Sequence, residues 1–128
     1  MTEASIGTGS IAFIGFGEAA RAFLDGWRTN PGFKARISAY DIKTDSPDPE
    51  VRAAKRADYA AAKVIGASDA PEAVVGAEAV FSVVTADQAH EAALAALPGL
   101  MKGALFFDCD SCAPFMRPGN AASAASCA

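Results

Sequence analysis

The 128-residue sequence has only three cysteines, a single histidine and no excess of positive charge. Three cysteines, an odd number, do not make a disulfide framework. The formal net charge is −4, and the Lys and Arg residues are scattered along the chain, whereas a nucleic-acid surface needs clustered positive charge. These absences exclude a disulfide-stapled secreted domain and argue against a nucleic-acid partner.

The sequence also lacks a long hydrophobic run. No apolar segment reaches the length of a membrane span. Residues 1–9 lack the basic start and apolar stretch of a secretory signal, so we expect them to be a short polar lead-in to a cytoplasmic protein with no membrane partner. With 52% hydrophobic and 20% charged residues, the composition is that of a globular chain, and the length fits one domain.

The most informative segment is residues 10–21, SIAFIGFGEAAR, in which an apolar run ends in glycines. Residues 11–14 are continuously apolar, as in a strand that is covered on both faces. After the glycines, Ala19, Phe23 and Trp27 follow at helical spacing. The segment therefore predicts a strand, a tight turn and a helix.

The small residues of this turn have the spacing of a dinucleotide-binding fingerprint. Gly15 allows the sharp turn, Gly17 lets a diphosphate approach the backbone, and Ala20 lets the helix pack closely on the strand. The unpaired N–H groups and the positive dipole end of the helix form an anion site. A tight turn without any ligand is the alternative interpretation.

A carboxylate in the next predicted strand supports the ligand. The fingerprint requires an acid about 20 residues on, and Asp41 ends an apolar segment 26 residues after Gly15. Such a carboxylate accepts both ribose hydroxyls of the adenosine and repels a 2′-phosphate, so NAD is the expected cofactor. Lys43 could soften that repulsion, which keeps NADP as the alternative.

The rest of the chain continues the alternation of strands and helices. Strands are predicted near residues 11–14, 34–40, 64–66, 79–84 and 104–108, and helices near 18–28, 49–63, 69–76 and 88–97. Asp48 and Asp69 are expected to cap the second and third helices, each ahead of a proline. This order predicts a single α/β domain over residues 10–117 with a doubly wound parallel sheet of the Rossmann type, followed by a low-complexity tail at 118–128.

The helix predicted at 49–63 has few large apolar residues. Its expected buried face is thin and its charged residues are expected to be solvated, a phosphate contact by Arg52 or Lys55 being the lesser alternative. The buried face would comprise Val51, Ala54, Ala57 and Ala61, and the solvated residues Arg52, Lys55 and Arg56.

Further candidates follow the fourth and fifth predicted strands. Ligands sit outside the carboxyl ends of parallel strands, so Val84 and Thr85 are expected near the cofactor. Asp87 is expected only to cap the next helix, and His90 to be structural or exposed. Cys109 and Cys112 form a C-x-x-C without a second pair of metal ligands, so we expect ordinary thiols and no metal.

Two motifs, residues 14–20 (IGFGEAA) and 111–114 (SCAP), resemble the amino-terminal NAD-binding domain of the 6-phosphogluconate dehydrogenase and β-hydroxyacid dehydrogenase-like family. The resemblance covers residues 11–114. It implies that the diphosphate is held at Gly15, Phe16, Gly17, Glu18 and Ala19, the adenosine ribose at Asp41, the cofactor beyond it at Val84 and Thr85, and the substrate at Ser111. Asp110 departs from the asparagine or serine of the family, which weakens the expected substrate contact.

Members of that family have a second, all-helical domain that supplies a lysine as general acid or base. Nothing in this sequence corresponds to it, so we expect a truncated member with an out-of-frame tail, no catalytic residue of its own and negligible turnover alone. A face left uncovered in this way favours self-association.

The sequence therefore predicts an NAD(P)-binding domain of an oxidoreductase that acts on a small hydroxy acid once a second domain is supplied. A non-catalytic dinucleotide-binding or interaction module is the alternative. A methyltransferase that uses S-adenosylmethionine is a weaker third choice, because Ala20 lies at the dinucleotide spacing.

Overall fold

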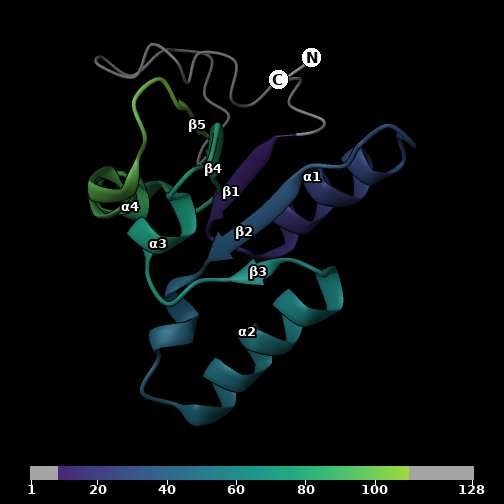
Figure 1. Cartoon of the computed structure of the whole chain (residues 1–128). Coiled ribbons are helices and arrows are strands. Elements are labelled where there is room, and N and C mark those ends of the chain that lie inside the picture. Colours follow the sequence, from purple (N-terminus) through teal and green to yellow (C-terminus); the bar gives the residue numbers. More distant parts are fainter. Residues whose placement is uncertain (1–8, 110–128) are drawn as a thin grey trace.

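The computed structural model describes residues 9–109, which form a parallel five-stranded sheet with helices on both faces (Figure 1). The strand order is β3-β2-β1-β4-β5. The strands are β1 (Ser10–Ile14), β2 (Arg36–Tyr40), β3 (Ile65–Gly66), β4 (Ala79–Ser82) and β5 (Leu105–Asp108). The helices are α1 (Glu18–Arg28), α2 (Pro49–Ala62), α3 (Ala70–Val74) and α4 (Ala89–Ala96), with short 3₁₀ turns η1 (Ile42–Asp45), η2 (Ala86–Gln88) and η3 (Leu97–Gly99). The predicted doubly wound Rossmann-type sheet is confirmed.

The centre of the sheet is β1, which pairs with β2 on one side and β4 on the other. Ile14, its last residue, lies opposite Tyr40 of β2 and Ser82 of β4. The chain thus leaves β1 toward one edge of the sheet and later returns to the other side of β1. In sheets of this kind, the crevice at the carboxyl ends of the strands where the direction reverses is the usual ligand site.

The two faces of the sheet are packed with different side chains. On the face covered by α1 and α2, the core includes Phe13, Phe16, Leu24 and Tyr59. The opposite core, under α3 and α4, consists mainly of small residues, Ala12, Ala67, Ala70, Ala73, Ala77 and Ala96, together with Ile14, Val74 and Val80. Figure 1 shows these two helix pairs on opposite sides of the strands. Large rings hold α1 in place, whereas alanines let α3 and α4 approach the sheet closely.

Local signals in the sequence place most of the helix ends correctly. Asp48 Oδ1 accepts the N–H of Glu50 at 2.9 Å, and Asp69 Oδ1 accepts the N–H of Glu72 at 2.8 Å, so both predicted caps are confirmed. α1 ends at Arg28, as predicted, ahead of the turn that contains Pro31. β4 is two residues shorter than predicted, ending at Ser82.

The predicted inner face of α2 is wrong. Ala54, Ala57 and Ala61 are exposed, and the residues that turn inward are Lys55 and Tyr59, which are 6% and 4% exposed. The ring of Tyr59 removes more apolar surface from water than methyl groups do. Lys55, predicted to be solvated, is buried because its charge is paired, whereas Arg56 is exposed as predicted.

Two sequence predictions concern membranes and domain limits. Among the helices formed by residues 9–109, none combines the length and hydrophobicity that a membrane crossing requires. All but Gly9 of the predicted lead-in at 1–9, and the whole predicted tail at 118–128, lie outside the described residues.

Candidate functional site

The turn after β1 is built around Gly15, whose conformation only glycine adopts readily. Its φ is +89°, and a Cβ on Gly15 would lie 2.8 Å from the carbonyl oxygen of Val83 and 2.9 Å from Cγ1 of Val84. The Gly15 N–H donates to the carbonyl of Tyr40 at 2.7 Å. The turn therefore packs between the carboxyl end of β2 and the residues that follow β4.

Gly17 differs from Gly15 because no neighbour within residues 9–109 requires it to be glycine. Its φ of −100° and ψ of −152° are extended, and an added Cβ would meet no heavy atom of those residues within 4 Å. It caps α1 without a side-chain hydrogen bond. Among the described residues no side chain caps the start of α1, and Glu18 and Ala19 in its first turn are exposed, an arrangement that fits an anionic group such as a diphosphate.

Asp41, at the end of β2, is tied to the same turn. Its Oδ2 accepts the N–H of Phe16 at 2.8 Å, and its Oδ1 accepts the N–H of Lys43 at 2.9 Å, which starts η1. Each carboxylate oxygen keeps a lone pair for a further donor. The backbone N–H of Asp41 donates to the hydroxyl of Tyr59 at 2.8 Å, so both ends of the residue are fixed.

A buried lysine of α2 completes this arrangement. Lys55 Nζ donates to the carbonyl of Phe16 at 2.7 Å and lies 3.7 Å from Oδ2 of Asp41. It is also 3.3 Å from Oδ2 of Asp58, whose Oδ1 lies 3.3 Å from Nη1 of Arg21 on α1. Sequence reasoning considered Lys55 only as a minor candidate for a phosphate contact.

Of the two cofactor residues predicted after β4, one lies against the glycine turn. Val84 is half-buried, with Cγ1 close to Gly15, whereas Thr85 is exposed. Asp87 is exposed and does not cap α4, so that prediction is wrong: the cap position is Gln88, reached through the 3₁₀ turn η2, and it has no side-chain bond. His90 is exposed on α4.

The predicted cofactor residues thus come from three elements at one edge of the sheet. The turn and the first residues of α1 supply Gly15, Phe16, Gly17, Glu18 and Ala19, the end of β2 supplies Asp41, and the segment after β4 supplies Val84 and Thr85. Phe16 is fully buried, while Glu18 and Ala19 are exposed in the first turn of α1.

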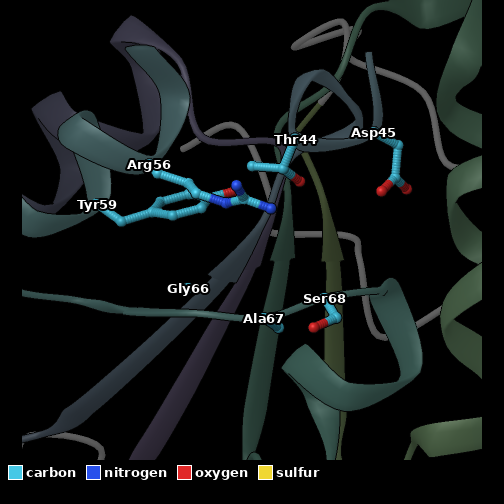
Figure 2. Close-up of a pocket in the computed structure, with 7 residues that line it drawn as sticks. All are labelled: Thr44, Asp45, Arg56, Tyr59, Gly66, Ala67 and Ser68. Carbon is cyan, nitrogen blue, oxygen red and sulfur yellow. The ribbon is translucent and has the colours of Figure 1, made fainter. Parts of the chain in front are cut away.

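A polar cavity of about 210 Å³ lies between α2, the η1 turn that follows Asp41, and the segment at and after β3. Arg56 and Tyr59 reach into it from α2, and Ser68 faces them from the segment after β3 (Figure 2). Its walls are completed by Thr44, Asp45, Gly66 and Ala67. Burial raises the pKa of the Tyr59 phenol, which stays neutral and accepts from the Asp41 N–H.

Most of the residues predicted to contact the substrate or to carry thiols lie outside residues 9–109. Ser111, Asp110, Cys112 and Cys127 lie outside the described residues, and Cys109 is buried. Within residues 9–109 no group of three or more His, Cys, Asp or Glu side chains is placed to hold a metal ion.

Comparison with known proteins identifies the kind of domain. Residues 10–110 match the family model described as "NADP oxidoreductase coenzyme F420-dependent". Among solved structures, a conserved hypothetical protein from Sinorhizobium meliloti 1021 is 32% identical with a TM-score of 0.70. The alignment covers 94% of this chain and 38% of that protein, so the chain spans well under half of this relative. No curated protein matches the chain significantly.

More distant structures share the fold. UDP-glucose dehydrogenase from Pyrobaculum islandicum is 18% identical with a TM-score of 0.57, over 99% of this chain and 35% of that one. The D-isomer specific 2-hydroxyacid dehydrogenase from Lactobacillus delbrueckii ssp. bulgaricus, solved in its NAD complexed form, is 16% identical with a TM-score of 0.51, over 85% and 30%. At such identities the likeness shows a common fold.

The family match supports the predicted oxidoreductase domain that binds a nicotinamide dinucleotide. The narrower assignment to the 6-phosphogluconate and β-hydroxyacid dehydrogenase-like group stays a prediction. Because the model matches residues 10–110, most of the sequence and all five strands, the chain belongs to the NADP oxidoreductase family described as coenzyme F420-dependent.

Proposed function

We propose that this chain binds NAD or NADP across the carboxyl edge of the sheet and presents the nicotinamide ring for hydride transfer with a small hydroxy acid or the corresponding oxo acid. The observation that carries the proposal is the open start of α1. Gly17 leaves free space beside uncapped N–H groups, and the Asp41 carboxylate is fixed to the same turn. Together they offer donors for a diphosphate and an acceptor for a ribose.

The diphosphate contacts are assigned to the backbone of residues 15–19. Amide N–H groups at a helix start bind phosphate oxygens without a basic side chain. The hydrogen bonds from Gly15 to Tyr40 and from Phe16 to Asp41 fix the turn before the ligand arrives. Little ordering entropy is then lost on binding, which favours affinity.

The adenosine ribose is assigned to Asp41. Its two oxygens already accept backbone N–H groups, so its orientation is set, and the remaining lone pairs are available to the ribose hydroxyls. The adenine end would then extend toward the cavity lined by Arg56, Tyr59 and Ser68, since Tyr59 joins that cavity to the backbone of Asp41.

The nicotinamide end is assigned to the segment with Val84 and Thr85, on the other side of Gly15 from Asp41. The bound cofactor supplies or accepts the hydride. Val84 provides an apolar wall beside the turn, and the exposed Thr85 hydroxyl is a donor for the cofactor. Contact with the substrate is assigned to Ser111, and the accompanying proton transfer to a group outside residues 9–109.

Calorimetric titration of the full chain with NAD, NADP and S-adenosylmethionine tests the proposal. We expect binding of a nicotinamide dinucleotide and none of the methyl donor. Asp41→Ala should weaken NAD by about tenfold or more, because a hydrogen bond to a charged group is lost. Asp25→Ala, at an exposed position in the second half of α1, is the matched control and should leave NAD affinity close to wild type.

Two outcomes would contradict the proposal. Binding of S-adenosylmethionine alone would exclude an oxidoreductase, and equal NAD affinity in wild type and Asp41→Ala would exclude the ribose contact. Dinucleotide binding without oxidation of any hydroxy acid, even when the longer relatives' remaining part is supplied, would favour a non-catalytic module.

A further inference from the structure

We infer that Lys55 sets the cofactor preference of the site, because its buried ammonium offsets the charge of Asp41 and so admits a ribose that carries a 2′-phosphate. The inference rests on the proposed position of the dinucleotide. It concerns a conflict in the observations: an acid at the end of β2 favours NAD, whereas the family match is to NADP oxidoreductases.

The first argument is geometric. The ammonium of Lys55 has three N–H groups and three acceptors around it: the carbonyl oxygen of Phe16 at 2.7 Å, Asp58 at 3.3 Å and Asp41 at 3.7 Å. Phe16 belongs to the glycine turn and Asp41 ends β2. One side chain of α2 therefore contacts both the proposed diphosphate loop and the proposed ribose acceptor.

The second argument is burial. The side chains of Lys55 and Asp41 are 7% and 13% exposed, so salt and water screen their attraction only weakly. A buried cation of this kind is retained only where its charge is paired. Lys55 thus partly offsets the negative charge that the carboxylate of Asp41 presents to a ligand.

The third argument is the charge balance of the whole cluster. Lys55 and Arg21 are positive, Asp41 and Asp58 are negative, and contacts between 3.3 and 3.7 Å link them in one chain. The cluster is neutral overall. A phosphate on the ribose therefore meets a compensated carboxylate, whereas an isolated one would repel it.

Removing the positive charge of Lys55 should have two effects. The turn loses a tether at Phe16, which weakens both dinucleotides, and Asp41 loses its counter-charge, which weakens NADP further. A purely structural lysine would produce the first effect alone. The ratio of the NADP and NAD dissociation constants is therefore the discriminating measurement.

The experiment compares Lys55→Gln with wild type by calorimetric titration of the full chain with NAD and with NADP. Glutamine keeps a donor for the Phe16 carbonyl while removing the charge. We expect the NADP affinity to fall about tenfold more than the NAD affinity. Lys34→Gln is the matched control: it removes an exposed lysine ahead of β2, at the opposite end of that strand, and should leave the ratio unchanged.

A second variant tests the inference should Lys55→Gln fail to fold. Asp58→Asn removes the carboxylate that competes for Lys55 and is itself one-third exposed. More of the lysine charge then acts on Asp41, so the ratio should shift toward NADP by about twofold.

An unchanged ratio in Lys55→Gln, or in Asp58→Asn if the first variant is unfolded, would overturn the inference while leaving the proposed function intact. A wild-type chain that binds neither dinucleotide would instead overturn the proposed function, and the inference with it.

Discussion

The amino ends of α1 and α2 begin in opposite ways. The N–H of Glu50 at the start of α2 is satisfied by the carboxylate of Asp48, and α3 has the same arrangement with Asp69. α1 follows Gly17, which has no side chain and so makes no side-chain hydrogen bond at the cap. Among the helices of residues 9–109, α2 and α3 have an acidic side-chain cap, whereas α1 and α4 have no side-chain cap bond.

The two helix starts also differ in position. Gly17 follows the central strand β1, which lies between β2 and β4, whereas Asp48 follows the η1 turn beyond β2 (Figure 1). A glycine at the cap position costs only about a few tenths of a kcal/mol relative to an aspartate. That cost falls at the one helix start among these where a bound diphosphate would offset it.

Giving α1 the cap that α2 has should have the largest effect. Gly17→Asp places a carboxylate where the diphosphate is proposed to bind, and dinucleotide affinity should fall at least about 100-fold, because like charges are brought together. Stability should stay the same or rise by less than about 1 kcal/mol, since the extended backbone and the free space accept a side chain.

Gly17→Asn is the matched control for this change. It offers a similar neutral cap, so its loss of affinity in the same titration should be clearly smaller. Wild-type affinity in Gly17→Asp would mean that the start of α1 is not the diphosphate site.

The second prediction separates the turn from the helix start. Gly15→Ala should lower the free energy of unfolding by about 2 to 3 kcal/mol, because the left-handed conformation and the close carbonyl of Val83 both resist a Cβ. Gly26→Ala lies inside α1, where no atom of the part of the chain that the structure describes comes within 4 Å of the added Cβ, and should instead raise stability by up to about 1 kcal/mol. Urea denaturation measures both, and equal effects would contradict the distinction.

The third prediction removes the cap from α2. Asp48→Ala should cost about 1 kcal/mol of stability in urea denaturation. Dinucleotide affinity should not change, because this cap is internal to the fold. Loss of binding at wild-type stability would show that the start of α2, and not that of α1 alone, faces the ligand.

The smallest effect concerns the acids in the first turns of the same two helices. Glu18 is exposed beside the proposed diphosphate, so Glu18→Gln should tighten dinucleotide binding by about two- to threefold at low salt. Glu50→Gln makes the same change at the start of α2 and should leave affinity unchanged. A loss of affinity in Glu18→Gln would indicate that this carboxylate accepts a hydrogen bond from the ligand.

Sequence alone predicts the strand, turn and helix around Gly15 and the approach of Asp41. Each depends on a local rule: an apolar run, glycines at fixed spacing and an acid at the end of the next strand. Parallel pairing then brings the carboxyl ends of β1, β2 and β4 to one edge, which is why Val84 is found beside Gly15.

The role of Lys55 was not predictable in this way. Its acceptors belong to three separate segments, the turn at Phe16, the end of β2 and its own helix, so no periodicity in α2 marks it as buried. Because lysine was treated as a solvated residue, the alanines of α2 were predicted to form its buried face. A charged side chain can be buried when the fold places opposite charges around it.

The contact between Gly15 and Val83 has a consequence for the order of assembly. The turn is held on one side by β2 but on the other by a segment made much later, since Val83 also donates to the Ile14 carbonyl at 2.8 Å. During synthesis, the edge of β1 that pairs with β4 has no hydrogen-bonding partner until β4 has been made. The contacts that surround Gly15 are therefore complete only once residues 83 and 84 have been synthesised.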